Sequence, residues 1–481
     1  MRHLLRSDRQ EDICFALWNP SRGKGRETAL IERLILPTDG DRRVHGNASF
    51  LPQYFERAIQ IARSNDSGIA LMHSHLGPGW QEMSDDDINA EKGNAPAVLG
   101  ATDLPLVGLT AGTDGAWSAR FWNRIGPRDY RRQWCESVRV VGDRLHTTFN
   151  DSLLARPQFG RQLTRTVSAW GRRNQEDVSR LRVGIIGAGS VGSIVAEILA
   201  RMGIANLYVI DFDIVKHHNL DRLLHATLKD AQNKRLKSEV LTERLKVSAT
   251  APGFSAIPFN LSVVEEEGFR QALDCDVLFS CVDRPWARFV LNFIAYAHLI
   301  PVIDGGVMLS AMSNEAGLKR GTWRAHIAAP TRKCLECLGQ YDPSDVSLER
   351  SGFLDDPAYI EGLPKDHRLR NGENVFPFCT SVASLEVNQF LRMVIPHPGR
   401  ANIGAQIQHF TTGEIDLDAT PCGPSCPFCG MIAKGDRSGY EGITGIDRAA
   451  DKMRSEGQNH PEIDSSRGIA RLFRKILSKW F

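Results

Sequence analysis

The chain has 481 residues, enough for two to four domains that each bury a core. Its 59 basic and 57 acidic residues give a formal net charge of +2, so charge gives no reason to expect nucleic acid as a partner. No apolar run reaches the roughly 18 residues of a membrane-spanning helix, and no signal peptide follows Met1. We therefore expect a cytoplasmic protein. Its ten cysteines include two Cys-x-x-Cys pairs, which in such a protein indicate metal binding before disulfide formation.

Strand and helix patterns alternate at the start of the chain. Residues 28–37 alternate like a strand, and a helix is expected over residues 52–63. Residues 68–75 are typical of a buried strand, which ends in His73 and His75. Because alternate side chains of a strand share one face, both imidazoles can hold one metal ion.

A serine and an acid follow these histidines. Ser84 and Asp87 open the next predicted helix, over residues 87–91. Two histidines and one carboxylate leave a fourth position for water, which is typical of a catalytic zinc site. The alternative is that the histidines only form hydrogen bonds and that Ser84 is a helix N-cap.

This His-x-His and Ser-x-x-Asp pattern resembles the motif of the JAMM (MPN-plus) metalloproteases. The resemblance implies a cytidine-deaminase-like α/β/α domain over residues 1–128, with a zinc-dependent peptidase activity. It also implies roles for five residues: zinc ligands His73, His75 and Asp87, Ser84 near the oxyanion, and the general base Glu11.

Two details of the resemblance are open. Glu27 and Glu32 are poorer matches to the general base than Glu11. Eight residues separate His75 from Ser84, one more than in the family, and the loop around residues 77–80 can absorb the extra residue. Relatives cleave after the C-terminal glycine of ubiquitin-like proteins, which implies such a bond as the substrate.

Residues 129–180 are polar, basic and mostly helical in pattern, so a helical linker is predicted. Within it, Arg165, Gly171 and Gln175 resemble the lead-in segment of ubiquitin-activating-type adenylyltransferases. There an arginine six residues before a glycine reaches the ATP site of the partner subunit, so the resemblance implies that Arg165 acts across a homodimer. A planar, permanently charged guanidinium suits a triphosphate.

A nucleotide-binding pattern follows the linker. A β-branched run leads into Gly187-x-Gly189-x-x-Gly192 and then into a segment of helical spacing. Glycines let the backbone approach a phosphate, and the helix start offers free N–H groups. The apolar run 207–210 ends in Asp211, which can accept the hydroxyls of a ribose. The pattern predicts a Rossmann-like, mostly parallel sheet.

Hydride transfer is the default chemistry of such a fold, so discriminating residues are needed. Four ordered segments that begin at residues 211, 218, 237 and 276 resemble the ATP site of the ThiF/MoeB family. The resemblance implies that Asp211 binds the ribose, that Asn219, Arg222 and Lys237 bind phosphates, and that Asp283 serves Mg²⁺.

The same resemblance implies an adenylation domain over residues 181–435. It would join the C-terminal carboxylate of a polypeptide to the α-phosphate of ATP and release pyrophosphate. The alternative is a dehydrogenase fold that carries these residues as surface charges.

Two cysteine pairs lie about ninety residues apart, so only the fold can join them. Four thiolates make a closed tetrahedral site, hence a structural zinc, and the same two-pair arrangement occurs in the ThiF/MoeB family. The predicted ligands are Cys334, Cys337, Cys426 and Cys429. A redox function of the pairs is the alternative.

Thioester formation on a cysteine follows adenylation in related enzymes. Cys379 follows the charged, loop-rich segment 342–373 and stands near the start of a predicted helix, whose dipole would favour its thiolate. Cys422 is the second candidate, and adenylation without a thioester stays open because the family's usual position holds no cysteine.

The tail comprises residues 436–481. Residues 436–465 are charged and expected to be loosely ordered, whereas residues 465–481 have the pattern of a basic amphipathic helix. Docking of this helix onto protein is favoured over membrane contact, because its net hydrophobicity is modest.

Together these resemblances imply an α/β fusion enzyme that uses ATP, Mg²⁺ and two Zn²⁺ ions, one catalytic and one structural. It would activate and cleave a ubiquitin-like β-grasp protein, act as a homodimer and work with a conjugating enzyme, as in bacterial conjugation operons, some of them linked to phage defence. One alternative is a sulfur-carrier adenylyltransferase whose peptidase domain trims the carrier in a biosynthetic pathway. Another is a scaffold with an inactive peptidase site.

Overall fold

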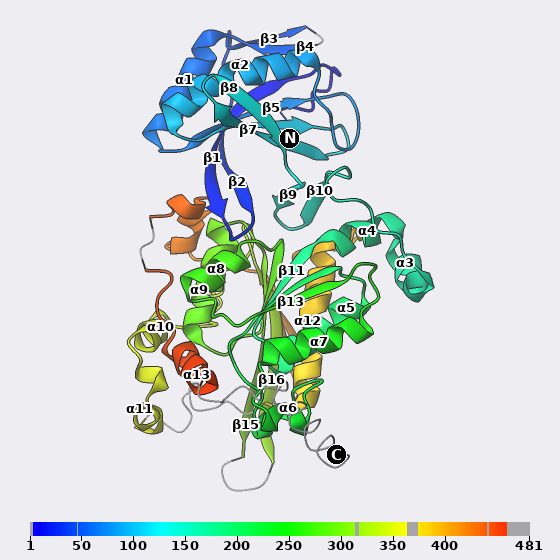
Figure 1. Cartoon of the computed structure of the whole chain (residues 1–481), viewed down its shortest axis with the longest axis vertical. Coiled ribbons are helices and arrows are strands. Elements are labelled where there is room, and N and C mark those ends of the chain that lie inside the picture. The colour runs from blue at the N-terminus through cyan, green and yellow to red at the C-terminus, as the bar shows by residue number, and fades with distance from the viewer. Residues whose placement is uncertain (1–2, 46, 313–316, 363–373, 440–441, 459–481) are drawn as a thin grey trace, which may run out of the picture.

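The chain is built on two sheets, which lie one after the other along the long axis of the molecule (Figure 1). A six-stranded sheet lies at one end and an eight-stranded sheet at the other, so the protein is a mixed α/β structure. The structure is a computed structural model, and it describes residues 3–45, 47–312, 317–362, 374–439 and 442–458.

The first sheet has the strand order β2-β1-β5-β6-β7-β8, and only its β5–β6 pair is parallel. Two helices and a short β3–β4 hairpin accompany it. The bounds are β1 Ile13–Arg22, β2 Glu27–Ile35, β3 Arg42–His45, β4 Asn47–Phe50, α1 Pro52–Ser64, β5 Gly68–Ser74, α2 Asp85–Thr102, β6 Leu106–Ala111, β7 Trp117–Gly126 and β8 Asp129–Trp134.

The predicted elements of this region are confirmed, with one change of length. The helix after the histidines starts at Asp85 instead of Asp87 and continues to Thr102. Ser84 is its N-cap, in a capping box with Asp87, which fixes the start of the helix. The prediction ended this helix too early because its buried face includes the polar residues Glu91 and Thr102, which interrupt the apolar pattern.

The prediction of a helical linker is wrong for its first part. Residues 129–149 form β8, the edge strand of the first sheet, and the hairpin β9 Ser137–Val141 and β10 Leu145–Phe149. Most residues of these strands are half-buried or exposed, and the buried ones are Tyr130 of β8 and Leu145 and Phe149 of β10, so the segment lacks the apolar alternation of a core strand. Helices follow only at α3 Thr164–Trp170 and α4 Arg172–Arg180.

The second sheet has the order β13-β12-β11-β14-β15-β16-β17-β18, parallel from β13 to β15 and antiparallel beyond. Its parallel half has the predicted Rossmann-like arrangement. The strand bounds are β11 Arg182–Ile186, β12 Asn206–Ile210, β13 Ser255–Phe259, β14 Val277–Ser280, β15 Val302–Ala311, β16 Leu318–Ala328, β17 Ala405–His409 and β18 Ile415–Asp418.

Helices cover both faces of this sheet. α5, α7 and α12 bury their apolar side chains on one face, and α8 and α9 on the other. The helix bounds are α5 Ser190–Arg201, α6 Leu228–Gln232, α7 Lys237–Ser248, α8 Glu266–Ala272, α9 Pro285–Ala297, α10 Pro343–Arg350, α11 Pro357–Gly362, α12 Phe376–Val394 and α13 Arg448–Gln458.

Two loop predictions are corrected by these helices. The segment expected to be loop-rich contains α10 and α11, and its residues 363–373 lie outside the described part. The tail contains α13, which Arg454 ties to Glu265 through its guanidinium. The amphipathic helix predicted over residues 465–481 lies outside the described residues. None of the described helices has the length and hydropathy to cross a membrane.

The β1–β2 hairpin joins the two bodies, because its tip lies on the second one (Figure 1). Ser21 Oγ lies 2.8 Å from Nδ1 of the buried His298. Near the turn, the Arg26 guanidinium pairs with Asp276 at 2.6 Å, and the amide of Gly25 donates to Asp274 at 2.9 Å. The hairpin is therefore part of both bodies.

Candidate nucleotide and metal sites

The predicted glycine turn connects β11 to α5. Gly187 has a φ of +95°, which favours glycine, and a Cβ at Gly192 would collide with the carbonyl oxygen of Gly187. Gly189 is the N-cap of α5, and a Cβ there would meet no atom within 4 Å. The turn thus leaves space in front of the first amides of α5, where a phosphate can bind.

Asp211 closes one side of this turn. Its carboxylate accepts hydrogen bonds from the amides of Ala188 at 2.6 Å and Asp213 at 2.7 Å. Burial raises its pKa to about 6, opposed by the nearby Lys237 ammonium. The predicted ribose acid is therefore fixed directly beside the glycine turn.

Lys237 is the first residue of α7, and its Nζ donates to Asp213 at 2.7 Å. Burial acts to lower its pKa, but the carboxylates of Asp211, Asp213 and Asp283 raise it above the usual value. Two of the predicted nucleotide residues, Asp211 and Asp283, thus lie around the ammonium group of a third, Lys237. Asp213 was not predicted as a site residue, although its Asp-x-Asp spacing with Asp211 places both at the end of β12.

Asn219 and Arg222 lie on a turn after this strand and already have partners. Asn219 accepts from the amide of Lys216 at 3.1 Å. Arg222 donates to the carbonyl of His218 at 2.6 Å and pairs with Asp221 at 2.8 Å. Both would have to exchange partners to bind a phosphate.

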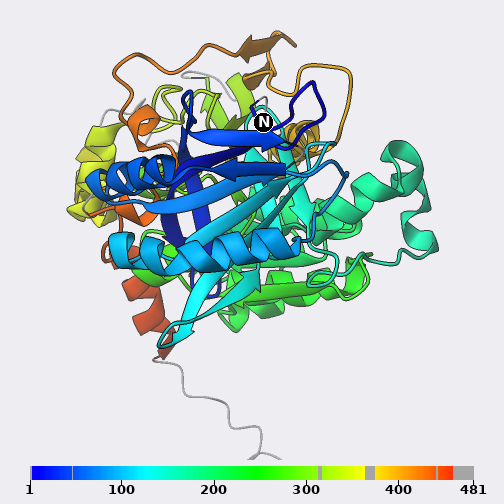
Figure 2. The ribbon, with the colours of Figure 1, turned by 90° about the horizontal axis from the view of Figure 1, so that it is seen from above.

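Arg165 lies on α3, which projects with α4 from the side of the molecule (Figure 2). Its side chain is exposed. The turn to α4 is made by Gly171 with a φ of +89°. A projecting, exposed arginine suits a contact with a second copy, and the role of Arg165 stays a prediction.

Cys379 lies in the first turn of α12 and is buried. Its Sγ donates to Oδ1 of Asn374 at 2.9 Å. Burial raises the pKa of the thiol, opposed by a hydrogen bond from Ser190, the first residue of α5, and by the charge of Arg222. Burial therefore acts against the predicted thiolate, yet the thiol stands beside the glycine turn.

Four cysteines cluster in the structure, and three of them are predicted zinc ligands. The ligand atoms of Cys334, Cys337, Cys422 and Cys426 lie within 4.8 Å of one another. Cys422 belongs to this set of four, whereas the predicted Cys429 is exposed on a short 3₁₀ helix, Pro427–Met431, where its thiol still interacts with Cys422 and Cys426. The Cys-x₃-Cys spacing of residues 422 and 426 is the sequence feature that could have indicated this.

The cysteine cluster has the dimensions of a zinc site. A tetrahedral ion with Zn–S distances of about 2.3 Å separates neighbouring sulfurs by roughly 3.8 Å. The Sγ atoms of Cys334 and Cys426 are 3.6 Å apart. Four thiols at this spacing fit a structural zinc ion.

The predicted catalytic ligands also converge. His75 Nε2 lies 3.2 Å from His73 Nε2 and 3.2 Å from Oδ2 of Asp87, while His73 Nε2 lies 3.3 Å from Oδ1 of Asp87. A tetrahedral zinc ion with ligands at about 2.0–2.1 Å separates its donors by roughly 3.3 Å, so the triad fits one ion. Burial acts to raise the pKa of Asp87, but hydrogen bonds from both histidines and Ser84 hold it well below its usual range.

Glu11 and Ser84 lie at this triad. Burial raises the pKa of Glu11, and the charges of His75 and His73 oppose this rise, so its carboxyl group lies within electrostatic range of both histidines. Ser84 Oγ is exposed and donates to Asp87 at 2.8 Å, so the N-cap and the predicted oxyanion role are compatible. The longer loop before Ser84 is anchored by Asp114, which accepts from the amide of Gly79 at 3.0 Å.

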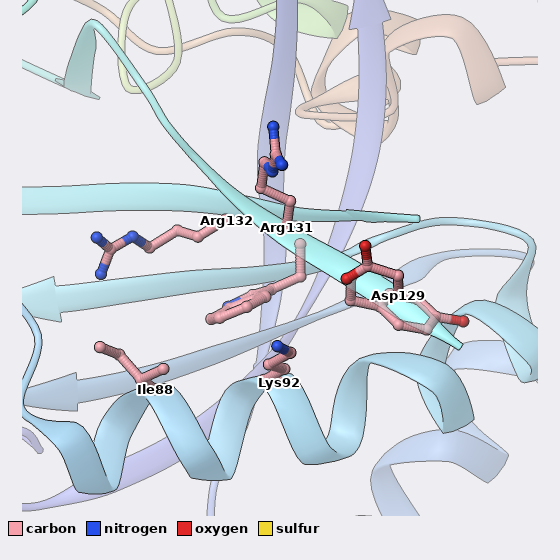
Figure 3. A pocket seen from close by; sticks show the side chains of 7 residues that line it. Ile88, Lys92, Asp129, Arg131 and Arg132 are labelled. Atoms are coloured by element: carbon pink, nitrogen blue, oxygen red, sulfur yellow. The ribbon is translucent and has the colours of Figure 1, made fainter. Parts of the chain in front are cut away.

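A cavity of about 360 Å³ opens between α2 and the edge strand β8 (Figure 3). Ile88, which follows the ligand Asp87, and Lys92 point into it from the helix. The other lining residues are Trp122, Asp129, Tyr130, Arg131 and Arg132.

Comparisons with known proteins concern mainly the second body. The profile of the ThiF family matches residues 159–427. The chain is similar to the adenylyltransferase and sulfurtransferase MOCS3 of Danio rerio, at 26% identity over 40% of this chain and 39% of that protein. It is also similar to UBA4, of the same description, from Yarrowia lipolytica, at 29% identity over 40% and 45%.

A third relative, the ubiquitin-like modifier-activating enzyme 5 of Dictyostelium discoideum, is 29% identical over 30% of this chain and 40% of its own length. The chain thus spans less than half the length of each of these curated relatives. A crystal structure of E. coli MccB with ATP superposes with a TM-score of 0.43 and 16% identity, over 56% of this chain and 75% of that chain.

Proposed function

Because this chain belongs to the ThiF family, which residues 159–427 match, we propose that it adenylates the C-terminal carboxylate of a small ubiquitin-like, β-grasp protein. The observation that carries the proposal is the convergence of Lys237, Asp211 and Asp283 at the glycine turn. An aspartate pair and a lysine beside such a turn match the needs of a nucleoside triphosphate and its Mg²⁺ ion.

Each residue has a definite task in this reaction. Asp211 would bind the ribose hydroxyls, and the amides at the start of α5 would bind phosphate oxygens. Lys237 would release Asp213 and neutralise charge that develops on the phosphates, while Asp283 would hold Mg²⁺. The carboxylate of the carrier then attacks the α-phosphate, the bond to the β-phosphate oxygen breaks, and pyrophosphate leaves.

An apolar surface beside Cys379 supports docking of a protein substrate. Phe378 lies with its ring 5.6 Å from Trp323 and 5.4 Å from Phe410, which is 56% exposed. Met308, on the neighbouring strand β15, is 52% exposed. Exposed aromatic groups of this kind mark protein interaction sites.

We propose that the acyl group of the adenylate is then transferred from AMP to Cys379. This thiol lies at the start of α12 and contacts Ser190 beside the glycine turn. The thiol would lose its proton as the sulfur attacks the acyl carbon, a thioester would form and the bond to AMP would break, so that AMP leaves. The second candidate, Cys422, is less suited to this role, since it lies within the cysteine cluster. A conjugating enzyme would take the thioester, and Arg165 would act in a homodimer.

For the first body we propose a zinc peptidase that processes or deconjugates the same carrier. His73, His75 and Asp87 would hold the ion, which supplies Lewis acidity when bound. Glu11 would take a proton from the attacking water and Ser84 would donate to the oxyanion. Such a pairing of activities suits a bacterial ubiquitin-like conjugation system, including one in phage defence.

A second candidate is activation of a sulfur carrier in biosynthesis. It is favoured by the names of MOCS3 and UBA4, which describe sulfurtransferases as well as adenylyltransferases. In that case the activated carboxyl group would become a thiocarboxylate, and the peptidase would trim the carrier precursor.

One experiment tests these proposals. The purified chain is incubated with Mg²⁺–ATP and β-grasp proteins encoded beside its gene, and the products are identified by mass spectrometry. A carrier adenylate and a thioester lost in Cys379→Ala support conjugation, whereas a thiocarboxylate supports sulfur transfer. Uptake of NAD without any adenylate would refute adenylation.

A further inference from the structure

The residue after Glu11 is a buried aspartate in a dense hydrogen-bond network. Asp12 is 1% exposed, and its two carboxylate oxygens accept from Nε and Nη2 of Arg42 at 2.5 and 3.0 Å. Arg6 adds a further contact at 3.3 Å. Two parallel hydrogen bonds from one guanidinium group fix both the distance and the orientation of a carboxylate.

The backbone of Asp12 is tied to the metal-site strand. Its amide donates to Ser74 Oγ at 3.0 Å, and its carbonyl accepts from the amide of Ser74 at 3.1 Å. Ser74 is fully buried and lies between His73 and His75. The side chain and the main chain of Asp12 are therefore both fixed relative to the two histidines.

The strand register shows what this does to the preceding residue. Ile13 pairs with His73 in the antiparallel β1–β5 ladder, and the Asp12–Ser74 bonds continue it by one residue. Opposed residues of an antiparallel pair share a face, and the face alternates along the strand. Glu11 is thereby directed to the side of the sheet that carries His73 and His75.

On this basis we propose that Asp12 and Arg42 are positioning residues that hold the Glu11 carboxylate over the His73, His75 and Asp87 triad. This inference rests on the proposed peptidase function. Burial of an ion pair is weak evidence for a role in stability, because the desolvation cost offsets the attraction. The pair instead fixes geometry, and a general base displaced by about 1 Å can lose on the order of a hundredfold in rate.

The same domain provides a matched control. Asp41 pairs with Arg57 of α1, is 6% exposed and also accepts hydrogen bonds from Thr38. This pair has the same chemistry and comparable burial, but its contacts do not include Glu11 or the residue between the histidines. A purely structural effect should therefore be similar for Arg42→Met and Arg57→Met.

The test measures cleavage of a C-terminal reporter fused to the carrier found by the adenylation assay. The full chain is loaded with zinc and compared as wild type, Arg42→Met, Arg42→Lys, Arg57→Met, Glu11→Gln and Glu11→Gln/Arg42→Met. We expect Arg42→Met to lower kcat by about tenfold or more, with KM and zinc content unchanged. The kcat of Arg42→Lys should lie between those of the wild type and Arg42→Met, since lysine keeps the charge but cannot form the two parallel hydrogen bonds.

The double variant separates positioning from stability. If Arg42 acts through Glu11, its loss has no further effect on kcat once Glu11 is glutamine. Equal losses in Arg42→Met and Arg57→Met, additive losses in the double variant, or an Arg42→Met enzyme as active as wild type would overturn the inference. A wild-type protein that does not cleave, while Glu11→Gln equals it, overturns the peptidase proposal instead.

Discussion

The sulfur of Cys422 accepts a hydrogen bond from the backbone amide of Cys334 at 3.1 Å. Cys422 is one of the four clustered cysteines, while Cys429 is exposed. We expect Cys422→Ser to lower the zinc content and the melting temperature, because structural zinc supplies folding free energy. Cys429→Ser should keep the zinc, as measured by chelator competition and thermal unfolding. The reverse pattern would identify Cys429 as the ligand.

Zinc stoichiometry also reports on the first body. We expect two ions per wild-type chain and one in Asp87→Asn, since a neutral amide is a poor zinc ligand. Asp86, one residue earlier in the same helix turn, is exposed, so Asp86→Asn is the matched control and should retain both ions. Elemental analysis measures the ratio, and ATP–pyrophosphate exchange should be the same in both variants. One ion in the wild type would favour an inactive peptidase scaffold.

Lys237 should be essential for adenylation but not for folding. We expect Lys237→Met to lower the rate of ATP–pyrophosphate exchange by about 10²–10³-fold, the usual effect of losing one charge-stabilising group. Lys246 is exposed on the same helix, and Lys246→Met should keep the wild-type rate. Similar losses in the two variants would point to damage of α7 and not to a role at the phosphates.

The glycines of the turn should separate stability from binding. In Gly192→Ala the new Cβ collides with the carbonyl oxygen of Gly187, so we expect a lower melting temperature together with lost ATP binding. A Cβ at Gly189 meets no protein atom within 4 Å, so Gly189→Ala should keep its stability. It should still bind ATP more weakly, because the methyl group stands where the phosphate approaches. Thermal unfolding and calorimetric titration with ATP check both expectations.

Asp211 should make ATP binding pH-dependent. Burial raises its pKa from 3.8 to about 6, so its contribution to stability is present below pH 3.8 and is lost as pH rises through 6. Binding has the opposite sign, because only the ionised carboxylate accepts both ribose hydroxyls. We expect the Kd for ATP to rise toward about tenfold per unit below pH 6. Calorimetry from pH 5.5 to 8 measures this slope, which should vanish in Asp211→Asn.

Local patterns carried most of what could be predicted. The glycine turn, the acid at the end of β12 and the His-x-His strand depend on contacts within a few residues, so spacing alone located them. Cys422 was missed because a cluster is assembled by tertiary packing, and five cysteines offer several sets of four. The thiolate of Cys379 was expected from its position near a helix start, but the tertiary fold buries the thiol, and burial raises its pKa. The edge strand β8 and the separate β9–β10 hairpin were predicted as helical because strands with few buried residues have little apolar periodicity.

The seating of the β1–β2 hairpin bears on how this protein can be dissected. Removal of the first 150 residues would take away the Ser21 contact of His298. It would also remove the ion pair of Asp276 with Arg26 and the hydrogen bond that Asp274 accepts from the amide of Gly25. Asp276 and Asp274 immediately precede β14, which leads to Asp283. A fragment that no longer consumes ATP would therefore report a damaged scaffold and not a dependence of one reaction on the other. Single substitutions in the intact polypeptide are the way to assign each activity to its own half.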